Sequence, residues 1–300
     1  MSTAAIYAAV VLFWGSLYFA ISFQVGAIAP EIAVAYRFGL SGAIILGWCI
    51  WQRKPLNFSA RQHLILFGQG VIMFSLTDML LYNAISYITS GVAALLLSTL
   101  PIFNIVFASI FLGMRIRPPV FVGAIFGVSG MVMVFWPELS AFDLTSASLI
   151  GFGLCLIATV SASLAQIVSA YNQRSGLPPV ETAGFCMLYG AAFSVLVSLC
   201  LGRNFTWDWS GGFLLSFAYI VIVCTVFSWV CYLILIGRIG PDRAGYVSIL
   251  VPIIALVIST LFEDFRWTIL SLAGAGAILS GSLFILLSFR NKTTGTRLQQ

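Results

Sequence analysis

The sequence predicts an all-α integral membrane protein, with ten transmembrane helices that form two inverted five-helix repeats. The prediction rests on composition, on apolar segments of membrane-spanning length and on an internal repeat. Of the 300 residues, 61% are hydrophobic and 8% are charged, and the mean hydropathy is +1.07. Soluble domains carry about 25% charged residues. A chain with so little polar surface is not a cytosolic enzyme, a nucleic-acid binder or a disulfide scaffold.

Ten segments have the length and composition of a membrane span. A helix needs about 20 mostly apolar residues to cross about 30 Å of hydrocarbon. The first segment follows no Lys or Arg, so it is predicted to be a retained span and not a cleaved signal peptide. The short connections leave no room for a soluble domain. The segments cover roughly residues 4–24, 31–51, 64–86, 90–113, 119–136, 146–171, 180–201, 209–236, 244–263 and 268–289.

The connections between these segments differ in charge. Alternate connections and the tail hold 11 of the 14 Lys and Arg residues, in the ranges 52–63, 114–118, 172–179, 237–243 and 290–300. The opposite side holds Arg203 and Arg266. Basic loops face the cytoplasm. We therefore expect a multi-pass protein of the cell inner membrane whose N- and C-termini are both cytoplasmic, with residues 291–300 as a cytoplasmic tail.

Two halves of the chain share a register of matching residues. When the sequence is shifted by 151 residues, Pro101 meets Pro252, Gly123 meets Gly274 and Gly130 meets Gly281. The match predicts one repeat in residues 1–140 and a second in 145–290. Because each repeat has an odd number of spans, the two lie inverted in the membrane. Inverted repeats that meet at a midplane site are typical of secondary transporters.

Several motifs resemble those of one transporter family. They are Trp14-Gly15-Ser16, the segment from Pro30 to Arg37-Phe38, residues 84–94 followed by Leu100-Pro101, and Arg243-Ala244 through Pro252. Together they resemble the drug/metabolite transporter superfamily of EamA-type ten-helix proteins, and most closely the YddG-type exporters of aromatic and other amino acids. The family's acidic residue after the glycine that ends the fourth span is absent here, where Met114 follows Gly113. Glu263 and Asp264 lie just short of the equivalent position in the second repeat, and no role is assigned to them.

Arg37 and Asp78 are the ionisable side chains predicted to lie well inside the spans. Arg37 lies about 10 Å inward from Pro30, and Asp78 lies about 12 Å from Ser86 at the same membrane edge. Opposite charges at similar depth on consecutive helices predict an intramembrane ion pair. Asp78 is a candidate substrate contact or proton-coupling acid, and the alternative is a structural pair that fixes two helices.

Aromatic and polar residues within the spans are candidates for the substrate cavity. Tyrosine and tryptophan offer an apolar face and one hydrogen-bonding group, which suits a mostly apolar substrate. Tyr82 shares a helix face with Asp78 and is the foremost candidate. Packing between helices or against lipid is the alternative for each residue. The predicted substrate-binding set is Tyr82, Asp78, Trp14, Tyr18, Ser98, Gln166, Tyr232 and Tyr246.

Pro101 and Pro252 are predicted near the centres of the fourth and ninth spans. A proline removes one backbone hydrogen bond and kinks a helix. Because the two prolines recur at one register of the inverted copies, we expect them to act as hinges. The alternative is a static bend used for packing.

No catalytic, metal or cofactor site is predicted. The six cysteines lie in apolar runs without the CxxC spacing of a metal or redox motif. Ser129 lies in a GxSG sequence, but His63, the single histidine, is in a distant connection. Without a nearby base, a serine nucleophile is not activated. There is also no Walker A sequence for ATP binding.

These observations predict a secondary transporter that works by alternating access. The resemblance implies export of amino acids, neutral or aromatic, across the inner membrane, with a proton as a candidate coupling ion. The partners are a small-molecule substrate and the lipid bilayer, and no nucleic acid. Export of another small metabolite or a cationic drug, an intramembrane enzyme and a passive channel are the alternatives.

Overall fold

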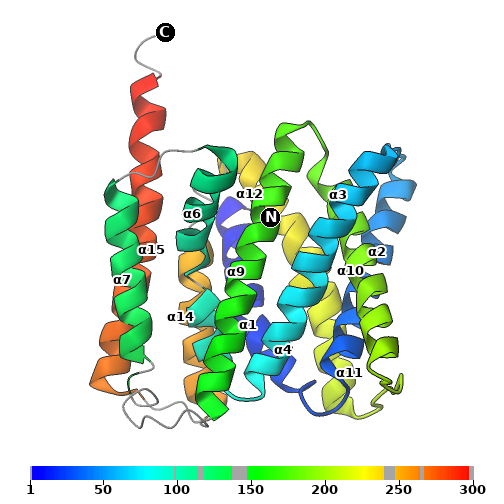
Figure 1. The fold of residues 1–300 in the computed structure, drawn as a ribbon, viewed down its shortest axis with the longest axis horizontal. Coiled ribbons are helices and arrows are strands. Elements are labelled where there is room, and N and C mark those ends of the chain that lie inside the picture. Colours follow the sequence, from blue (N-terminus) through cyan, green and yellow to red (C-terminus); the bar gives the residue numbers. More distant parts are fainter. Residues whose placement is uncertain are drawn as a thin grey trace.

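Every regular element in the residues that the structure describes is a helix (Figure 1). The structure is a computed structural model, and it describes residues 2–97, 99–113, 118–134, 136, 147–239, 247–263 and 267–296. Seven helical segments within these ranges are long and apolar enough to cross a membrane, and three shorter apolar helices accompany them. The prediction of an all-α, multi-span membrane protein is therefore confirmed.

The first half of the chain contains five apolar helical segments in succession. The third consists of two α-helices joined by a π-helix, and the fourth is divided into two helices. The elements are α1 (Thr3–Ser22), α2 (Pro30–Trp51), α3 (Ala60–Val71), η1 (Ile72–Leu76), α4 (Thr77–Ile85), α5 (Ser90–Leu97), α6 (Leu100–Leu112) and α7 (Pro118–Val134).

The second half follows the same order. Its third segment again contains a π-helix between two α-helices. The elements are α9 (Ala147–Arg174), α10 (Pro179–Cys200), α11 (Gly211–Ala218), η2 (Tyr219–Phe227), α12 (Ser228–Ile239), α14 (Val247–Phe262) and α15 (Ile269–Thr296).

Local sequence explains where several helices begin. Ser2 caps α1 by accepting a hydrogen bond from the backbone N–H of Ala5. Ser59 and Gln62 form a capping box at the start of α3. Pro30 and Pro179 each occupy the first turn of a helix, where the missing N–H costs nothing.

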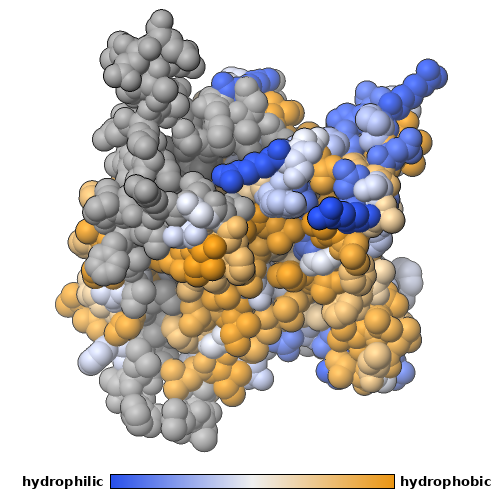
Figure 2. Space-filling model, turned by 45° about the horizontal axis from the view of Figure 1, so that its top comes forward, coloured by the Kyte–Doolittle hydropathy of each residue, from blue (hydrophilic) through white to orange (hydrophobic). Residues whose placement is uncertain are grey.

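Hydrophobic side chains cover much of the visible face, and hydrophilic ones gather mainly at its upper edge (Figure 2).

Helix pairing follows the order of the two halves. The second spans, α2 and α10, pack on each other, as do the fifth spans, α7 and α15. The first span of each half packs on the fourth and third spans of the other half. Thus α1 packs on α14 and α12, and α9 packs on α6 and α4. These pairings exchange when one half is substituted for the other, as expected for two units of equivalent fold.

The prolines of the fourth and ninth spans occupy different places in their helices. The sequence predicts Pro101 near the centre of one continuous helix, but it lies in the first turn of α6, which begins at Leu100 after Thr99. Proline is accommodated there because the first helical residues have no intrahelical acceptor for an N–H. Pro252, by contrast, lies inside α14.

The third and eighth spans carry π-helical turns that the sequence analysis did not predict. The hydroxyl of Thr77 donates to the carbonyl of Ile72 at 2.7 Å. In η2 the hydroxyl of Thr225 donates to the carbonyl of Ile220 at 2.8 Å. Both acceptors lie five residues back, the spacing of a π-helical turn. Such turns occur frequently at functional sites.

Candidate functional site

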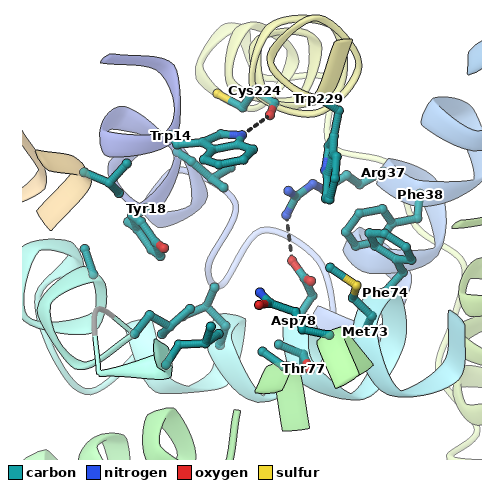
Figure 3. A pocket seen from close by; sticks show the side chains of 18 of the residues that line it. Trp14, Tyr18, Arg37, Phe38, Met73, Phe74, Thr77, Asp78, Cys224 and Trp229 are labelled. Atoms are coloured by element: carbon teal, nitrogen blue, oxygen red, sulfur yellow. Dashed lines mark hydrogen bonds and ion pairs between the residues drawn. The ribbon is translucent and has the colours of Figure 1, made fainter. Parts of the chain in front are cut away.

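A cavity of about 260 Å³ lies between the two halves of the chain (Figure 3). Its walls come from α1, α2, η1, α4, α5 and α6 of the first half and from α9, η2, α12 and α14 of the second. The lining is mostly apolar, with a few polar groups, which is the usual composition of a small-molecule site. Its volume lies just below the range of about 300–1,000 Å³ for drug-sized ligands.

Arg37 and Asp78 form an ion pair in the wall of this cavity. Arg37 Nη1 donates to Asp78 Oδ1 at 2.8 Å, and the two side chains are only 6% and 14% exposed. Arg37 comes from the middle of α2, and Asp78 comes from the first turn of α4, directly after η1. Removal of one partner from a buried pair costs about 3–5 kcal/mol, because the other charge is then left uncompensated.

Arg37 has further contacts that hold its guanidinium in place. Its Nε–H donates to Thr225 Oγ1 of η2 at 3.2 Å. Its guanidinium carbon lies 4.6 Å from the ring centre of Phe38, which packs in turn on Phe74 of η1. The pair is thus supported by both π-helical segments, one from each half of the chain.

Asp78 uses only part of its hydrogen-bonding capacity. Oδ1 accepts from Arg37, whereas Oδ2 has no hydrogen-bond partner among the described residues. A carboxylate has about four lone-pair sites. Because Asp78 lines the cavity, this remaining capacity is available to a bound molecule.

Two tryptophans lie across the cavity from Asp78 (Figure 3). The indole Nε1–H of Trp14 donates to the carbonyl of Cys224 at 3.1 Å, which fixes the ring. Trp14 and Trp229 meet edge to face, with ring centres 6.0 Å apart. This wall offers aromatic faces to an apolar or cationic group.

A short chain of polar side chains connects α6 and α9 beside the cavity. Asn104 Nδ2 donates to Gln166 Oε1 at 2.8 Å, and the hydroxyl of Ser163 donates to Asn104 Oδ1 at 2.7 Å. Of these three residues Gln166 lines the cavity. The network gives each of the two amides a hydrogen-bond partner, which lowers the cost of burying them.

The structure brings together several of the residues predicted for the site. Asp78, Trp14, Tyr18, Gln166 and Pro252 all line the cavity, together with Arg37. Ser98 and Tyr246 lie outside the described residues.

Tyr82 and Tyr232 are not among the lining residues. Tyr82 is buried, and its hydroxyl donates to Gln24 Oε1 at 2.9 Å. The same hydroxyl lies near Arg37. Tyr232 packs on Trp14, with ring centres 5.0 Å apart. Both tyrosines therefore support residues of the cavity from behind.

Trp229 and Thr225 are not in the substrate-binding set predicted from the sequence. The repeat could have found the first, because Trp229 lies 151 residues after Asp78 and so occupies the equivalent position in the second half. Thr225 has no such signal. Its role depends on a contact with Arg37, which is 188 residues away in the chain.

Ser129 and His63, the two residues considered for an enzyme, lie on different helices and have different partners. The hydroxyl of Ser129 donates to the carbonyl of Phe126 within α7, and His63 Nδ1 contacts the hydroxyl of Tyr189 at 2.8 Å between α3 and α10. No cluster of three or more His, Cys, Asp or Glu side chains that could hold a metal occurs in the described ranges.

Comparison with known proteins gives consistent matches. The profile of the EamA-like transporter family matches residues 2–136 and again 149–287. An "Uncharacterized transporter" of Archaeoglobus fulgidus is 25% identical over 287 residues, covering 92% of this chain and 95% of that protein. The "Uncharacterized inner membrane transporter YedA" of Escherichia coli K12 is 26% identical over 259 residues, covering 84% and 80%.

Two further matches extend the comparison. A "Probable amino-acid metabolite efflux pump" of Escherichia coli K12 is 24% identical over 283 residues, covering 91% of this chain and 90% of that protein. A solved crystal structure superposes with a TM-score of 0.68 at 20% identity, covering 97% of this chain and 98% of that chain. The structural match shows the same fold.

Proposed function

Because the chain belongs to the EamA-like transporter family, we propose that it is a secondary transporter that exports amino acids, neutral or aromatic, across the inner membrane. Residues 1–140 and 145–290 act as inverted repeats that expose the cavity to each side in turn. The chain carries out no catalytic step of its own. The basic connections face the cytoplasm, which places both termini on that side.

The observation that carries the proposal is the Arg37–Asp78 pair in the cavity wall. An uncompensated charge in the hydrocarbon region costs at least ~2.5–3.5 kcal/mol. Charges at such depth mark substrate or ion pathways. This pair lies in the space between the two halves, where a transporter of inverted repeats binds its substrate. One positive and one negative group together match the two charges of an amino acid.

The rest of the cavity supports an amino acid with a neutral or aromatic side chain. The wall opposite Asp78 contains Trp14 and Trp229, and Leu17 and Val251 add apolar surface. The volume of about 260 Å³ suits a small solute. One relative is named as an amino-acid metabolite efflux pump, which agrees with this substrate class.

Transport by the purified full-length protein tests the proposal. Liposomes are preloaded with labelled phenylalanine, leucine or lysine, and release is measured with and without unlabelled amino acid outside. We expect saturable flux that external substrate accelerates for phenylalanine and leucine. A pH gradient that changes the flux would identify the proton as the coupling ion. Absence of protein-dependent flux for every amino acid contradicts the proposal.

A cationic substrate is the second candidate. Asp78 faces two tryptophans, and an acidic group opposite aromatic faces is an arrangement that binds ammonium groups. In the same liposomes, a quaternary ammonium that competes as strongly as phenylalanine would favour this candidate.

A further inference from the structure

We infer that Thr225 is a positioning residue that allows the Arg37–Asp78 pair to exchange partners with a zwitterionic substrate. The inference rests on the proposed function and adds that the site requires the ammonium and the carboxylate of the amino acid together. In the exchange, the ammonium binds Asp78 and the carboxylate binds Arg37. Thr225 keeps Arg37 at the cavity wall during the exchange.

The geometry of the ion pair permits such an exchange. A single hydrogen bond of 2.8 Å joins Arg37 Nη1 to Asp78 Oδ1. Asp78 Oδ2 has no partner within the described part of the chain. The guanidinium has five N–H donors, of which one binds Asp78 and one binds Thr225. A substrate can therefore contact both groups before their mutual bond is broken.

Charge balance selects for a zwitterion. Both side chains are buried, so each needs a partner when their mutual bond is lost. A substrate with an ammonium alone would pair with Asp78 and leave Arg37 uncompensated. A substrate with a carboxylate alone would have the opposite effect. A zwitterion replaces both lost contacts and leaves the site electrically neutral.

Thr225 is suited to hold Arg37 while the partners change. Its hydroxyl proton is committed to the carbonyl of Ile220 at 2.8 Å, so its oxygen is left as an acceptor for Arg37 Nε–H at 3.2 Å. Thr225 itself is buried at 1% exposure. The Nε contact does not involve the terminal nitrogens, which stay available to a carboxylate. The arginine side chain has considerable rotamer freedom, so without this contact its head group would be held less firmly, by packing on Phe38, when Asp78 is released.

The π-helical turn of η2 determines the direction of this hydroxyl. In an α-helix a threonine hydroxyl bonds to a carbonyl three or four residues back. In η2 the Thr225 acceptor lies five residues back. Ser216, in α11 of the same span, also donates its hydroxyl to a backbone carbonyl, that of Phe213 at 2.9 Å, but it neither lines the cavity nor contacts Arg37. Ser216 therefore offers a control in the same span.

The experiment compares three variants with the wild-type protein in liposomes. Thr225→Val keeps the shape but removes the hydroxyl, Thr225→Ser keeps the hydroxyl, and Ser216→Ala removes a hydroxyl that does not contact Arg37. Each protein is assayed for phenylalanine flux in competition with phenethylamine, which has only the ammonium, and with 3-phenylpropionate, which has only the carboxylate. Elution profile and thermal unfolding in detergent report whether each variant is folded.

We expect each single-charge analogue to compete at least about tenfold more weakly than phenylalanine, the factor given by one charge-assisted hydrogen bond. Thr225→Val should raise the KM for phenylalanine about tenfold on the same basis. It should also reduce the factor by which phenylalanine competes more strongly than phenethylamine. Thr225→Ser and Ser216→Ala should retain the wild-type KM and the wild-type selectivity.

Two results would overturn the inference while leaving amino-acid export intact. One is phenylalanine flux that phenethylamine or 3-phenylpropionate inhibits as strongly as phenylalanine itself. The other is a Thr225→Val protein that matches Thr225→Ser in KM and in selectivity. The first of these tests uses only the wild-type protein, so it does not depend on whether a variant folds. Absence of flux for all amino acids overturns the proposed function itself.

Discussion

Thr77 and Ser228 stand 151 residues apart, and each donates its hydroxyl at 2.7 Å to the carbonyl oxygen five residues earlier. The residue that follows each of them, Asp78 or Trp229, lines the cavity. The two halves of the chain thus share a backbone irregularity as well as an order of helices. The same turn presents an acid in one half and an aromatic ring in the other, so the site itself is asymmetric.

The Arg37–Asp78 pair is expected to matter for stability and for transport in separable ways. Asp78→Asn and Arg37→Met should each lower the free energy of unfolding by about 3–5 kcal/mol, because each leaves a buried charge unpaired. The double variant should regain most of that stability but transport no amino acid. Chemical unfolding in detergent and flux in liposomes measure the two effects. Equal destabilisation of the single and double variants would contradict the prediction.

Tyr82 is expected to act on stability more than on substrate affinity. Its buried hydroxyl donates to Gln24 Oε1, and Gln24 Nε2 has no partner in the described ranges. Tyr82→Phe leaves a second polar atom of Gln24 unsatisfied, at a cost of about 1–3 kcal/mol. The melting temperature should fall, while the KM for phenylalanine should change by less than a factor of about two, or about 0.4 kcal/mol, because Tyr82 does not line the cavity. Tyr87→Phe, at a half-exposed position, is the control.

Gly130 and Gly274 hold α7 and α15 in close contact. A Cβ added at either glycine would lie 2.6 Å from the other's carbonyl oxygen. Small residues allow such approach between membrane helices. Gly130→Ala should therefore destabilise the protein by about 1–3 kcal/mol, the usual effect of overpacking. Gly276→Ala is the matched control, because a Cβ there meets nothing within 4 Å. Equal melting temperatures for the two variants would contradict the close packing.

Glu263 connects the end of α14 to the start of α5. Its Oε2 accepts from the backbone N–H of Ser90 at 3.0 Å and from the Ser90 hydroxyl at 2.6 Å. The helices are close beside this contact, since a Cβ on Gly91 would lie 2.7 Å from Ser259 Cβ. Removal of Glu263 should loosen α5, because charge-assisted hydrogen bonds each contribute about 1.5–3 kcal/mol.

The labelling rate of Cys155 can report a loosening of α5, because Cys155 is fully buried and contacts the carbonyl of Ala93 in α5. In a protein with Cys155 as its single cysteine, Glu263→Ala should raise the rate of maleimide labelling at least about tenfold, as follows from the loss of 1.4 kcal/mol or more. Glu31→Ala is the control, since Glu31 pairs with Arg203 and not with α5. An unchanged labelling rate would show that Glu263 does not hold the start of α5 against the end of α14.

Sequence reasoning found a large part of the candidate site, for an identifiable reason. Charges are rare in the spans, so Arg37 and Asp78 stood out, and their distances from the span ends placed them at one depth. The same reasoning selected Trp14, Tyr18 and Gln166, which line the cavity. It could not separate them from Tyr82, which shares a helix face with Asp78 but turns its hydroxyl to Gln24. Tyrosines within an apolar span look alike in sequence because hydropathy does not give the rotation of a helix about its axis.

The sequence by itself determined that this protein is helical, crosses a membrane several times and carries paired charges at depth. It could do so because the bilayer requires internal backbone hydrogen bonds, long apolar segments and compensated charges, and each of these constraints is local in the chain. Only the tertiary structure decided that η1 and η2 are π-helical, that Pro101 starts a helix, and that Thr225 holds Arg37. These features depend on how helices from the two halves pack, which brings residues far apart in the sequence into one site.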